Sequence, residues 1–237
     1  MGCPECGIDN AADHNYCKSC GFPLRLQQLK GDLTTGFAER ARARCLLVIK
    51  HNPGSAEAHF SLGMAEYHLG RLTEAIHGFQ RAVALDETMA DAHFQLAVCY
   101  YRRGLFGDCT TSCRSALHYN SASVPAMYRL GRALFHLGKL EEALSTFNQL
   151  VGLDPDYVIA YYHVGIIQER LGNVPGAIEA FASVAAANPG DAAAHYHLGL
   201  NYKRQGLDDL AIGEFMRALQ IDPSDRASEA ELRSLQR

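Results

Sequence analysis

The sequence predicts an all-α fold, an array of helix pairs, with a small cysteine-rich module in front of it. Two observations carry this prediction. Small residues recur at a constant spacing of 34 positions through most of the 237-residue chain. Four cysteines also lie in two close pairs within the first 20 residues. The composition agrees, because 48% hydrophobic and 20% charged residues are typical of a globular protein with a sizeable core.

The N-terminal cysteines predict a metal site. Cys3, Cys6, Cys17 and Cys20 form two C-x2-C pairs separated by ten residues. Two residues between thiolates let each pair turn onto one ion, and four thiolates complete a closed tetrahedron with no open position for a substrate. A segment this short cannot bury a core of its own, so metal binding would supply its folding energy. We expect one structural Zn2+ at these four residues.

Two alternatives use the same four cysteines, namely a pair of disulfides and a rubredoxin-like iron site. The lack of a secretion signal before Cys3 argues against disulfides. The block C-P-x-C-G, followed by Y-C-x-x-C-G-x-x-L ending at Leu24, resembles the small zinc ribbons at the N-termini of many prokaryotic proteins. This resemblance covers residues 1–24 and implies a structural zinc ion.

The remainder of the chain repeats, and each repeat predicts two helices. In residues 56–89, apolar side chains recur at helical spacing on both sides of Gly70, and a loop glycine suits the end of a helix. A small residue on each helix would let the two cross closely, and an aromatic ring would fill the gap beside them. The periodic positions are Gly63, Ala97, Gly131, Gly165 and Gly199; Gly36, Gly70, Gly104, Gly138, Gly172 and Gly206; Ala41, Ala75, Cys109, Ala143, Ala177 and Ala211; and Phe79, Cys113, Phe147, Phe181 and Phe215.

A period of 34 with this order of small and aromatic residues and a late proline is similar to the tetratricopeptide repeat. The resemblance extends over residues 22–225 and implies a superhelical solenoid of antiparallel helix pairs. We expect a zinc ribbon at 1–24, a degenerate first repeat at 25–55, five repeats at 56–89, 90–123, 124–157, 158–191 and 192–225, and a capping helix at 226–237. In the degenerate repeat, Leu29 stands where the small residue belongs.

The other cysteines fall within the repeats. Cys109 and Cys113 take the alanine and phenylalanine positions of the second repeat, and Cys45 matches Cys113 in the degenerate one. We expect buried free thiols that pack as small hydrophobic side chains. Neither this pair nor Cys99 has a predicted role beyond core packing.

The resemblance also implies a binding groove lined by the first helix of each repeat. Its floor would be aromatic, and a strip of cations would run along one side. The expected groove residues are Phe60, Phe94, Tyr128, Tyr162 and Tyr196 at the fifth position, Arg129 at the sixth, Met64 and Arg132 at the ninth, Tyr67 and Tyr101 at the twelfth, and Arg102, Arg170 and Arg204 at the thirteenth. In the alternative interpretation, the fifth-position aromatics belong partly to the core and the charges are merely solvated.

These features predict a non-catalytic scaffold or adaptor that binds another protein through an extended or helical segment with apolar and acidic residues. The Lys–Asn clamp of chaperone-binding members is absent, because its positions hold Phe60, Met64, Gln95 and Arg129. No P-loop, dinucleotide fingerprint, nucleophile elbow or H-E-x-x-H motif is present, so no enzyme is expected. The sequence names neither the partner nor the oligomeric state.

Charge argues against a nucleic-acid partner, although it leaves one alternative. The formal net charge is −4, and the excess of cations is confined to residues 22–55. The alternative function is therefore a nucleic-acid-associated regulator that uses the ribbon and this basic helix. We expect Arg42 on the outer surface of the array. No apolar run approaches the roughly 18 residues of a membrane span, so we expect a cytoplasmic protein. The resemblance to zinc ribbons of prokaryotic proteins implies a prokaryotic cytoplasm.

Overall fold

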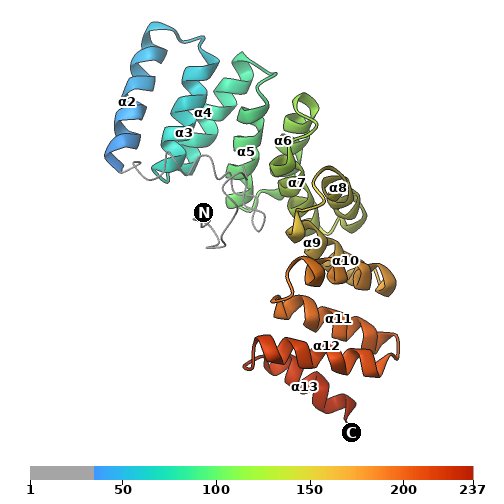
Figure 1. The fold of residues 1–237 in the computed structure, drawn as a ribbon. Helices are drawn as coiled ribbons and strands as arrows, with labels where there is room; N and C mark the ends of the chain where they lie inside the picture. The colour runs from blue at the N-terminus through green and yellow to red at the C-terminus, as the bar shows by residue number, and fades with distance from the viewer. Residues whose placement is uncertain (1–34, 237) are drawn as a thin grey trace. The chain divides into compact units, whose positions relative to one another are not determined.

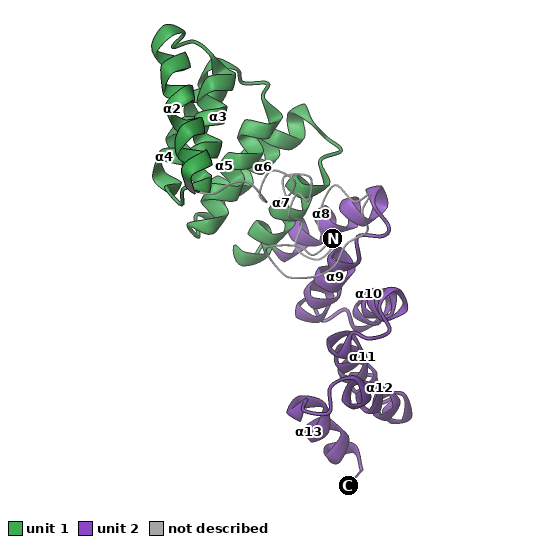
Figure 2. Cartoon of the chain, turned by 60° about the vertical axis from the view of Figure 1, so that its left-hand side comes forward, with its two compact units in different colours: residues 1–139 green, residues 140–237 purple. Residues whose placement is uncertain are grey.

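The computed structural model describes residues 35–236, which form twelve α-helices and no β-strand (Figure 1). The all-α prediction is confirmed. The predicted zinc ligands Cys3, Cys6, Cys17 and Cys20 lie outside the described residues, as does Leu29. The chain divides into two compact units, residues 1–139 and 140–237 (Figure 2).

The helices of the first unit are α2 (Thr35–His51), α3 (Ala56–His68), α4 (Leu72–Leu85), α5 (Ala90–Arg102), α6 (Phe106–Tyr119) and α7 (Val124–His136). Those of the second are α8 (Leu140–Leu153), α9 (Val158–Arg170), α10 (Val174–Ala187), α11 (Ala192–Arg204), α12 (Asp208–Ile221) and α13 (Arg226–Leu235). Within each unit the helices pack chiefly on their neighbours in sequence, and α5 also contacts α7. Such an array is held together by local contacts.

Glycine ends the first helix of each pair. Five turn glycines have φ between 72° and 78°, a region that residues with a Cβ rarely adopt. At the first turn, the Arg71 amide donates to the Glu66 carbonyl at 2.9 Å and the Gly70 amide donates to the Tyr67 carbonyl at 3.0 Å. These bonds satisfy carbonyls that the end of α3 would leave unpaired. The residues in this conformation are Gly70, Gly104, Gly138, Gly172 and Gly206.

A glycine on the first helix and a phenylalanine on the second hold three of the described helix pairs close. A Cβ added at Gly63 would lie 2.7 Å from the ring of Phe79, which is fully buried. The second unit repeats the arrangement twice, since a Cβ at Gly165 would meet Phe181 and one at Gly199 would meet Phe215, both at 2.6 Å. Burying one such ring stabilises the fold by about 1.5–3 kcal/mol. We call this contact the Gly–Phe clasp.

The second repeat replaces the clasp with smaller groups. Cys109 and Cys113 are fully buried free thiols, as is Cys99. The expected packing role of the Cys109–Cys113 pair agrees with this burial. Cys45 differs, because it is only half-buried although it shares the position of Cys113.

An ion-pair network joins α2 to the next helix pair and corrects the expectation for Arg42. The Arg42 Nε donates to Glu66 at 2.7 Å, and Glu66 is only 4% exposed. Arg71 bridges Glu66 and Glu39 with distances of 3.4 and 2.7 Å. Arg42 therefore takes part in a helix–helix contact, whereas the sequence predicted an uninvolved residue on the outer surface. The sequence could not show this, because the pairing depends on how α2 and α3 cross.

Candidate functional site

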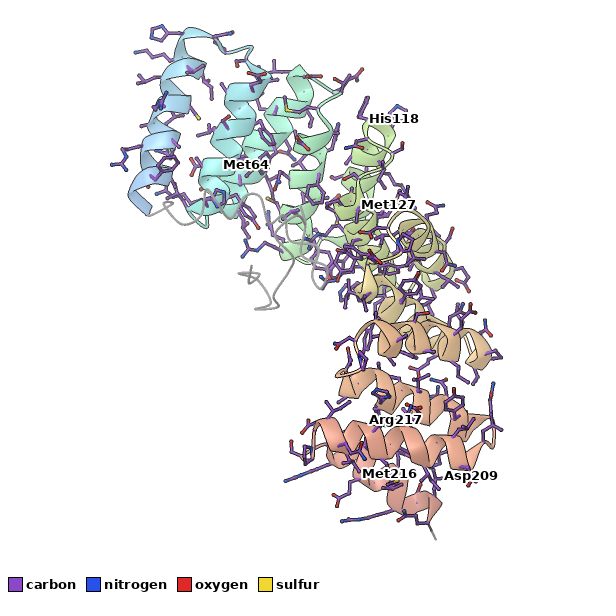
Figure 3. The ribbon with its side chains drawn as sticks, in the orientation of Figure 1. Met64, His118, Met127, Asp209, Met216 and Arg217 are labelled. Atoms are coloured by element: carbon purple, nitrogen blue, oxygen red, sulfur yellow. The ribbon has the colours of Figure 1, made fainter. Side chains whose placement is uncertain are left out.

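The first helices of the repeats carry every predicted groove residue. In the first unit, α3 carries Phe60, Met64 and Tyr67; α5 carries Phe94, Tyr101 and Arg102; and α7 carries Tyr128, Arg129 and Arg132. In the second unit, α9 carries Tyr162 and Arg170, and α11 carries Tyr196 and Arg204. Figure 3 marks Met64 on α3. We call the side of α3, α5 and α7 that bears Met64, Tyr67, Tyr101, Arg102, Arg129 and Arg132 the first-helix face.

The aromatic side chains at the fifth position pack against the core more than they are exposed on the surface. Phe94 is 9% exposed and Tyr128 only 3% exposed. The half-buried Phe60 packs against the clasp residue Phe79, and the half-buried Tyr162 packs against Phe181. In both pairs the ring centroids are 5.6 Å apart. Tyr196 lies 6.1 Å from Phe215 in the same way. An open ladder of five aromatic side chains is therefore not what the structure presents, because these rings fill the space beside the clasps.

The twelfth-position tyrosines of the first unit lie under arginines from the neighbouring first helix. The guanidinium of Arg102 lies 5.1 Å from the ring centroid of Tyr67. Those of Arg129 and Arg132 lie 4.9 and 4.8 Å from the centroid of Tyr101. A guanidinium stacked on an aromatic ring is attracted to its π-electrons and keeps its N–H edge available for a planar acceptor.

Tyr101 is held in place by two residues that the predicted groove did not include. Its hydroxyl lies 2.9 Å from the Nε2 of His136, and its ring meets Phe106 edge-on at 5.4 Å. The imidazole of His136 stacks on Phe106 at 4.5 Å. Burial raises the pKa of Tyr101, although the charges of Arg132 and Arg129 oppose this effect, so the phenol stays neutral near neutral pH. The spacing of 35 residues between Tyr101 and His136 recurs between Tyr67 and Arg102, and this signal is present in the sequence.

The arginines of the first-helix face have no acid beside them. Within residues 35–236, no carboxylate oxygen lies within 4.0 Å of Arg102, Arg129 or Arg132. The Nε of Arg129 is buried and has no hydrogen-bond partner in the described part of the chain. A buried N–H without an acceptor costs about 1–3 kcal/mol.

In the second unit, by contrast, a carboxylate of the chain itself lies beside an arginine of the predicted groove. Glu169 on α9 accepts from the Asn201 amide at 2.6 Å and lies 3.2 Å from His197 Nδ1 and 3.5 Å from Arg204. Burial alone would raise the pKa of Glu169, but the bond and charge of His197, the Asn201 bond and the charge of Arg204 together lower it. The Tyr162 hydroxyl lies 3.3 Å from the other nitrogen of His197. Arg204 is therefore neutralised within the chain.

The histidines of the second unit serve helix packing. His195, on another side of α11, lies 2.6 Å from Glu214 through Nδ1 and 3.3 Å from the Pro189 carbonyl through Nε2. His195 and His197 thus bind different glutamates. Over the part of the chain that the structure describes, no cluster of three or more His, Cys, Asp or Glu residues could hold a metal ion.

Comparison with known families agrees with this architecture. A tetratricopeptide repeat model matches residues 114–158, 128–192 and 165–226, and a second model described as a TPR repeat matches residues 63–104. The chain belongs to the tetratricopeptide repeat (TPR) family. A search of functionally curated proteins finds no significant match.

Solved TPR structures resemble the chain over most of its length. YrrB, described as a TPR protein with an unusual peptide-binding site, is 22% identical, with a TM-score of 0.72 over 78% of this chain and 96% of its own. MamA is 26% identical, with a TM-score of 0.66 over 68% of this chain and 95% of its own. PilF of Pseudomonas aeruginosa is 16% identical, with a TM-score of 0.65 over 89% and 94%. These likenesses establish the TPR solenoid fold.

Proposed function

We propose that this TPR protein is a non-catalytic adaptor whose first-helix face binds a segment of another protein. One observation carries the proposal: half-buried tyrosines on this face lie beneath arginines that meet no carboxylate in the described residues. Aromatic residues and arginine are the types most enriched at protein interfaces. The peptide-binding site named for YrrB adds support from the same fold.

The proposed partner segment is extended or helical and carries apolar side chains and at least one acid. Met64 and Tyr67 are partly exposed and offer apolar contact area. Arg102, Arg129 and Arg132 favour an acid, since a guanidinium and a carboxylate make strong charge-assisted hydrogen bonds. The second unit offers a second candidate surface, formed by Tyr162, Arg170, Tyr196 and Arg204. This surface favours an acidic side chain of the partner less strongly, because Glu169 already neutralises Arg204.

Peptide display tests this function directly. A random library selected on the full chain should enrich peptides that combine leucine or aromatic residues with aspartate or glutamate. Tyr67→Ala should weaken the enriched peptides roughly tenfold or more, because an aromatic anchor and the support of Arg102 are lost together. Tyr128 is unsuitable for this test, because it is only 3% exposed and its loss would damage the core.

Tyr119→Ala is the matched control. Tyr119 is an exposed tyrosine of the same unit at the end of α6; it stacks on His93 and is not one of the residues that define the first-helix face. Its truncation should leave peptide affinity unchanged. Absence of any enriched peptide family, or equal effects of the two tyrosine substitutions, would exclude the first-helix face as the binding surface.

We further propose that Cys3, Cys6, Cys17 and Cys20 bind one structural Zn2+. Their spacing and the closed set of four thiolates support it. Elemental analysis of the purified chain should give one zinc per molecule. Chelation should release it while most helical circular dichroism persists, because the repeats are stabilised by their neighbours. A metal-free protein with these four thiols paired as disulfides would refute this proposal.

The place of action is a proposal of the same kind. No helix within residues 35–236 is long and apolar enough to cross a membrane. We propose a cytoplasmic location, which also suits reduced thiols and a thiolate-bound zinc ion.

A further inference from the structure

A groove lies between α10 and α12 in the second unit, where both helices pack on α11 (Figure 1). Its volume is about 540 Å³. The methyl groups of Ala182, Ala185 and Ala186 line it on α10, and Leu198 and Tyr202 line it on α11. We call it the α10–α12 groove. It shares no residue with the first-helix face, so it is a separate feature of the molecule.

Small side chains on α10 leave this groove open. In the first repeat, Gln80 stands at the position of Ala182, and its amide donates to the Tyr100 hydroxyl at 3.0 Å. The corresponding residues of the fourth repeat are Ala182 and Tyr202, so the side chain that would bridge the two helices is missing. The other four repeats carry a longer side chain at this position: Gln80, Arg114, Asn148 and Met216. The alanine is therefore particular to the fourth repeat.

The charged side chains that line the α10–α12 groove are paired with one another. His195 Nδ1 lies 2.6 Å from one oxygen of Glu214, and Arg217, marked in Figure 3, donates to the other oxygen at 2.8 Å. The surface left for a ligand is chiefly hydrocarbon, because it includes the three alanine methyl groups and the exposed Ile221. Apolar side chains gain most from contact with such a surface.

The charge around the groove favours a basic partner. Residues 140–237 hold 14 Asp and Glu against 7 Lys and Arg, whereas residues 1–139 hold 12 against 15. Glu179 is exposed on α10, three residues before Ala182, and within residues 35–236 no cation lies within 4.0 Å of its carboxylate. Complementary charge selects a partner and speeds its association. Lysine or arginine beside the apolar side chains of a ligand would meet this negative charge.

We infer that the α10–α12 groove docks a basic amphipathic helix of a second protein. Alanine lets the backbone of a helix approach closely, because the distance between packed helices depends on the side chains at the contact. Apolar side chains three and four residues apart share one face of a helix and can enter the groove together. Combined with the proposed function, this site lets the adaptor hold two partners of opposite charge, one on each unit.

The probe is a blocked helical peptide with leucine on one face and lysine on the other, added to the full chain. Calorimetry gives its affinity, and NMR follows the methyl resonances of Ala182 and Ala185. We expect saturable shifts of both, and no shift for Ala84 of α4, which has the repeat position of Ala186 but follows the larger side chains of its own helix. An equal shift at Ala84, or tighter binding of the same peptide with glutamate for lysine, would overturn the inference.

Two variants of α10 locate the binding site. Ala182→Gln installs the side chain that the first repeat carries at this exposed position, and it should weaken the peptide roughly tenfold or more by filling the groove. Ser183→Gln makes the same substitution one residue further along, outside the groove lining, and should leave the affinity unchanged. Equal affinities of the two variants would show that the peptide binds elsewhere on the acidic surface and would refute the inference.

Two further comparisons separate the groove from the first-helix face. Replacing the leucines of the probe by alanine should abolish binding, and a peptide that binds equally well without them would contradict an apolar groove. Tyr67→Ala should leave the leucine–lysine peptide bound as in the wild type, and Ala182→Gln should leave the peptides selected on the first-helix face unaffected. Failure of the groove experiment therefore leaves the proposed function standing, and the reverse also holds.

Discussion

The cysteine side chains of the repeats differ in environment, and this difference should govern their reactivity. Burial raises the pKa of Cys99 to about 11, so almost none of it is thiolate near neutral pH. Cys109 and Cys113 are fully buried, whereas Cys45 is half-buried. The thiolate is the reactive form, and it must also be reachable. The hydrogen bond with Cys113 lowers the pKa of Cys109, whereas burial raises the pKa of Cys45, so accessibility and not thiolate content separates these two cysteines.

We therefore predict selective alkylation in the native state. Brief treatment with iodoacetamide, followed by peptide mass spectrometry, should label Cys45 and leave Cys99, Cys109 and Cys113 unlabelled. All four should react after unfolding in urea. Native labelling of Cys109 at the rate of Cys45 would show that α6 opens readily or packs differently.

Among single residues, the sequence predicted contacts that follow the period and missed those that depend on a helix crossing. The core alanines, the clasp rings and the turn glycines all repeat every 34 positions, so one repeat explains the next. The pairing of Arg42 with Glu66 does not repeat and was not foreseen. The burial of Tyr128 agrees with the alternative in which the fifth-position aromatics belong partly to the core, and position alone could not decide whether the next helix covers the ring.

Helix pairs depend on the Gly–Phe clasp, and two glycines of one pair provide a matched test. Gly199→Ala should lower the unfolding free energy by roughly 1–3 kcal/mol, because the added Cβ would lie 2.6 Å from the buried ring of Phe215. Gly213→Ala, at an exposed position of α12 where an added Cβ would meet nothing within 4 Å, should be neutral or stabilise by up to about 1 kcal/mol. Urea unfolding followed by circular dichroism measures both. Similar midpoints for the two variants would disprove the clasp.

The contact between α9 and α11 should depend on pH through Glu169. Its pKa in the folded chain lies below the ordinary value of 4.5, so its contribution to stability is present above that value and is lost as pH falls through the lower, folded pKa. The wild type should therefore melt higher than Glu169→Gln at pH 6, and the difference should shrink below pH 4. Melting curves at several pH values check this. A difference that grows on acidification would have the wrong sign for a carboxylate stabilised by His197 and Arg204.

The attachment of α2 to the rest of its unit should depend on Arg42. Arg42→Ala leaves the buried Glu66 with Arg71 alone, at 3.4 Å. We predict faster hydrogen exchange of the α2 amides, with little change in α5 and α6, because repeat contacts are local. Arg40→Ala, an exposed neighbour on the same helix, is the control. Equal exchange in the two variants would mean that the ion pair does not hold the helix.

For the chain in its entirety, the period predicted more than the individual surface residues did, and the zinc site that the cysteine spacing predicts stays a prediction. The all-α TPR solenoid follows from the constant repeat spacing and is confirmed by the helices and by the family models. The proposed first-helix binding face was predicted only in outline. Tyr101 lies under two arginines because α5 contacts α7. This contact joins different positions of two successive repeats, so the pattern within a single repeat could not predict it.

The overall charge argues against tight nucleic-acid binding. The net charge is −4, and one cation of the basic segment, Arg42, is already paired with Glu66. We predict weak binding to duplex DNA or single-stranded RNA at low salt, lost as salt approaches physiological strength. Fluorescence anisotropy over a salt series measures it. A sequence-selective complex that survives roughly 0.2 M salt, the range in which phosphate contacts are screened, would favour the alternative function.

The Gly–Phe clasp also bears on how the chain can change in length. Each clasp joins two residues of one repeat, as Gly165 joins Phe181 and Gly199 joins Phe215. Cutting out or duplicating one full period of residues therefore leaves every remaining clasp with its own partner, whereas the loss or gain of one residue between a clasp glycine and its ring would misalign the two. Whole repeats can therefore be added or removed, and the proposed binding face would lengthen or shorten by one repeat at a time.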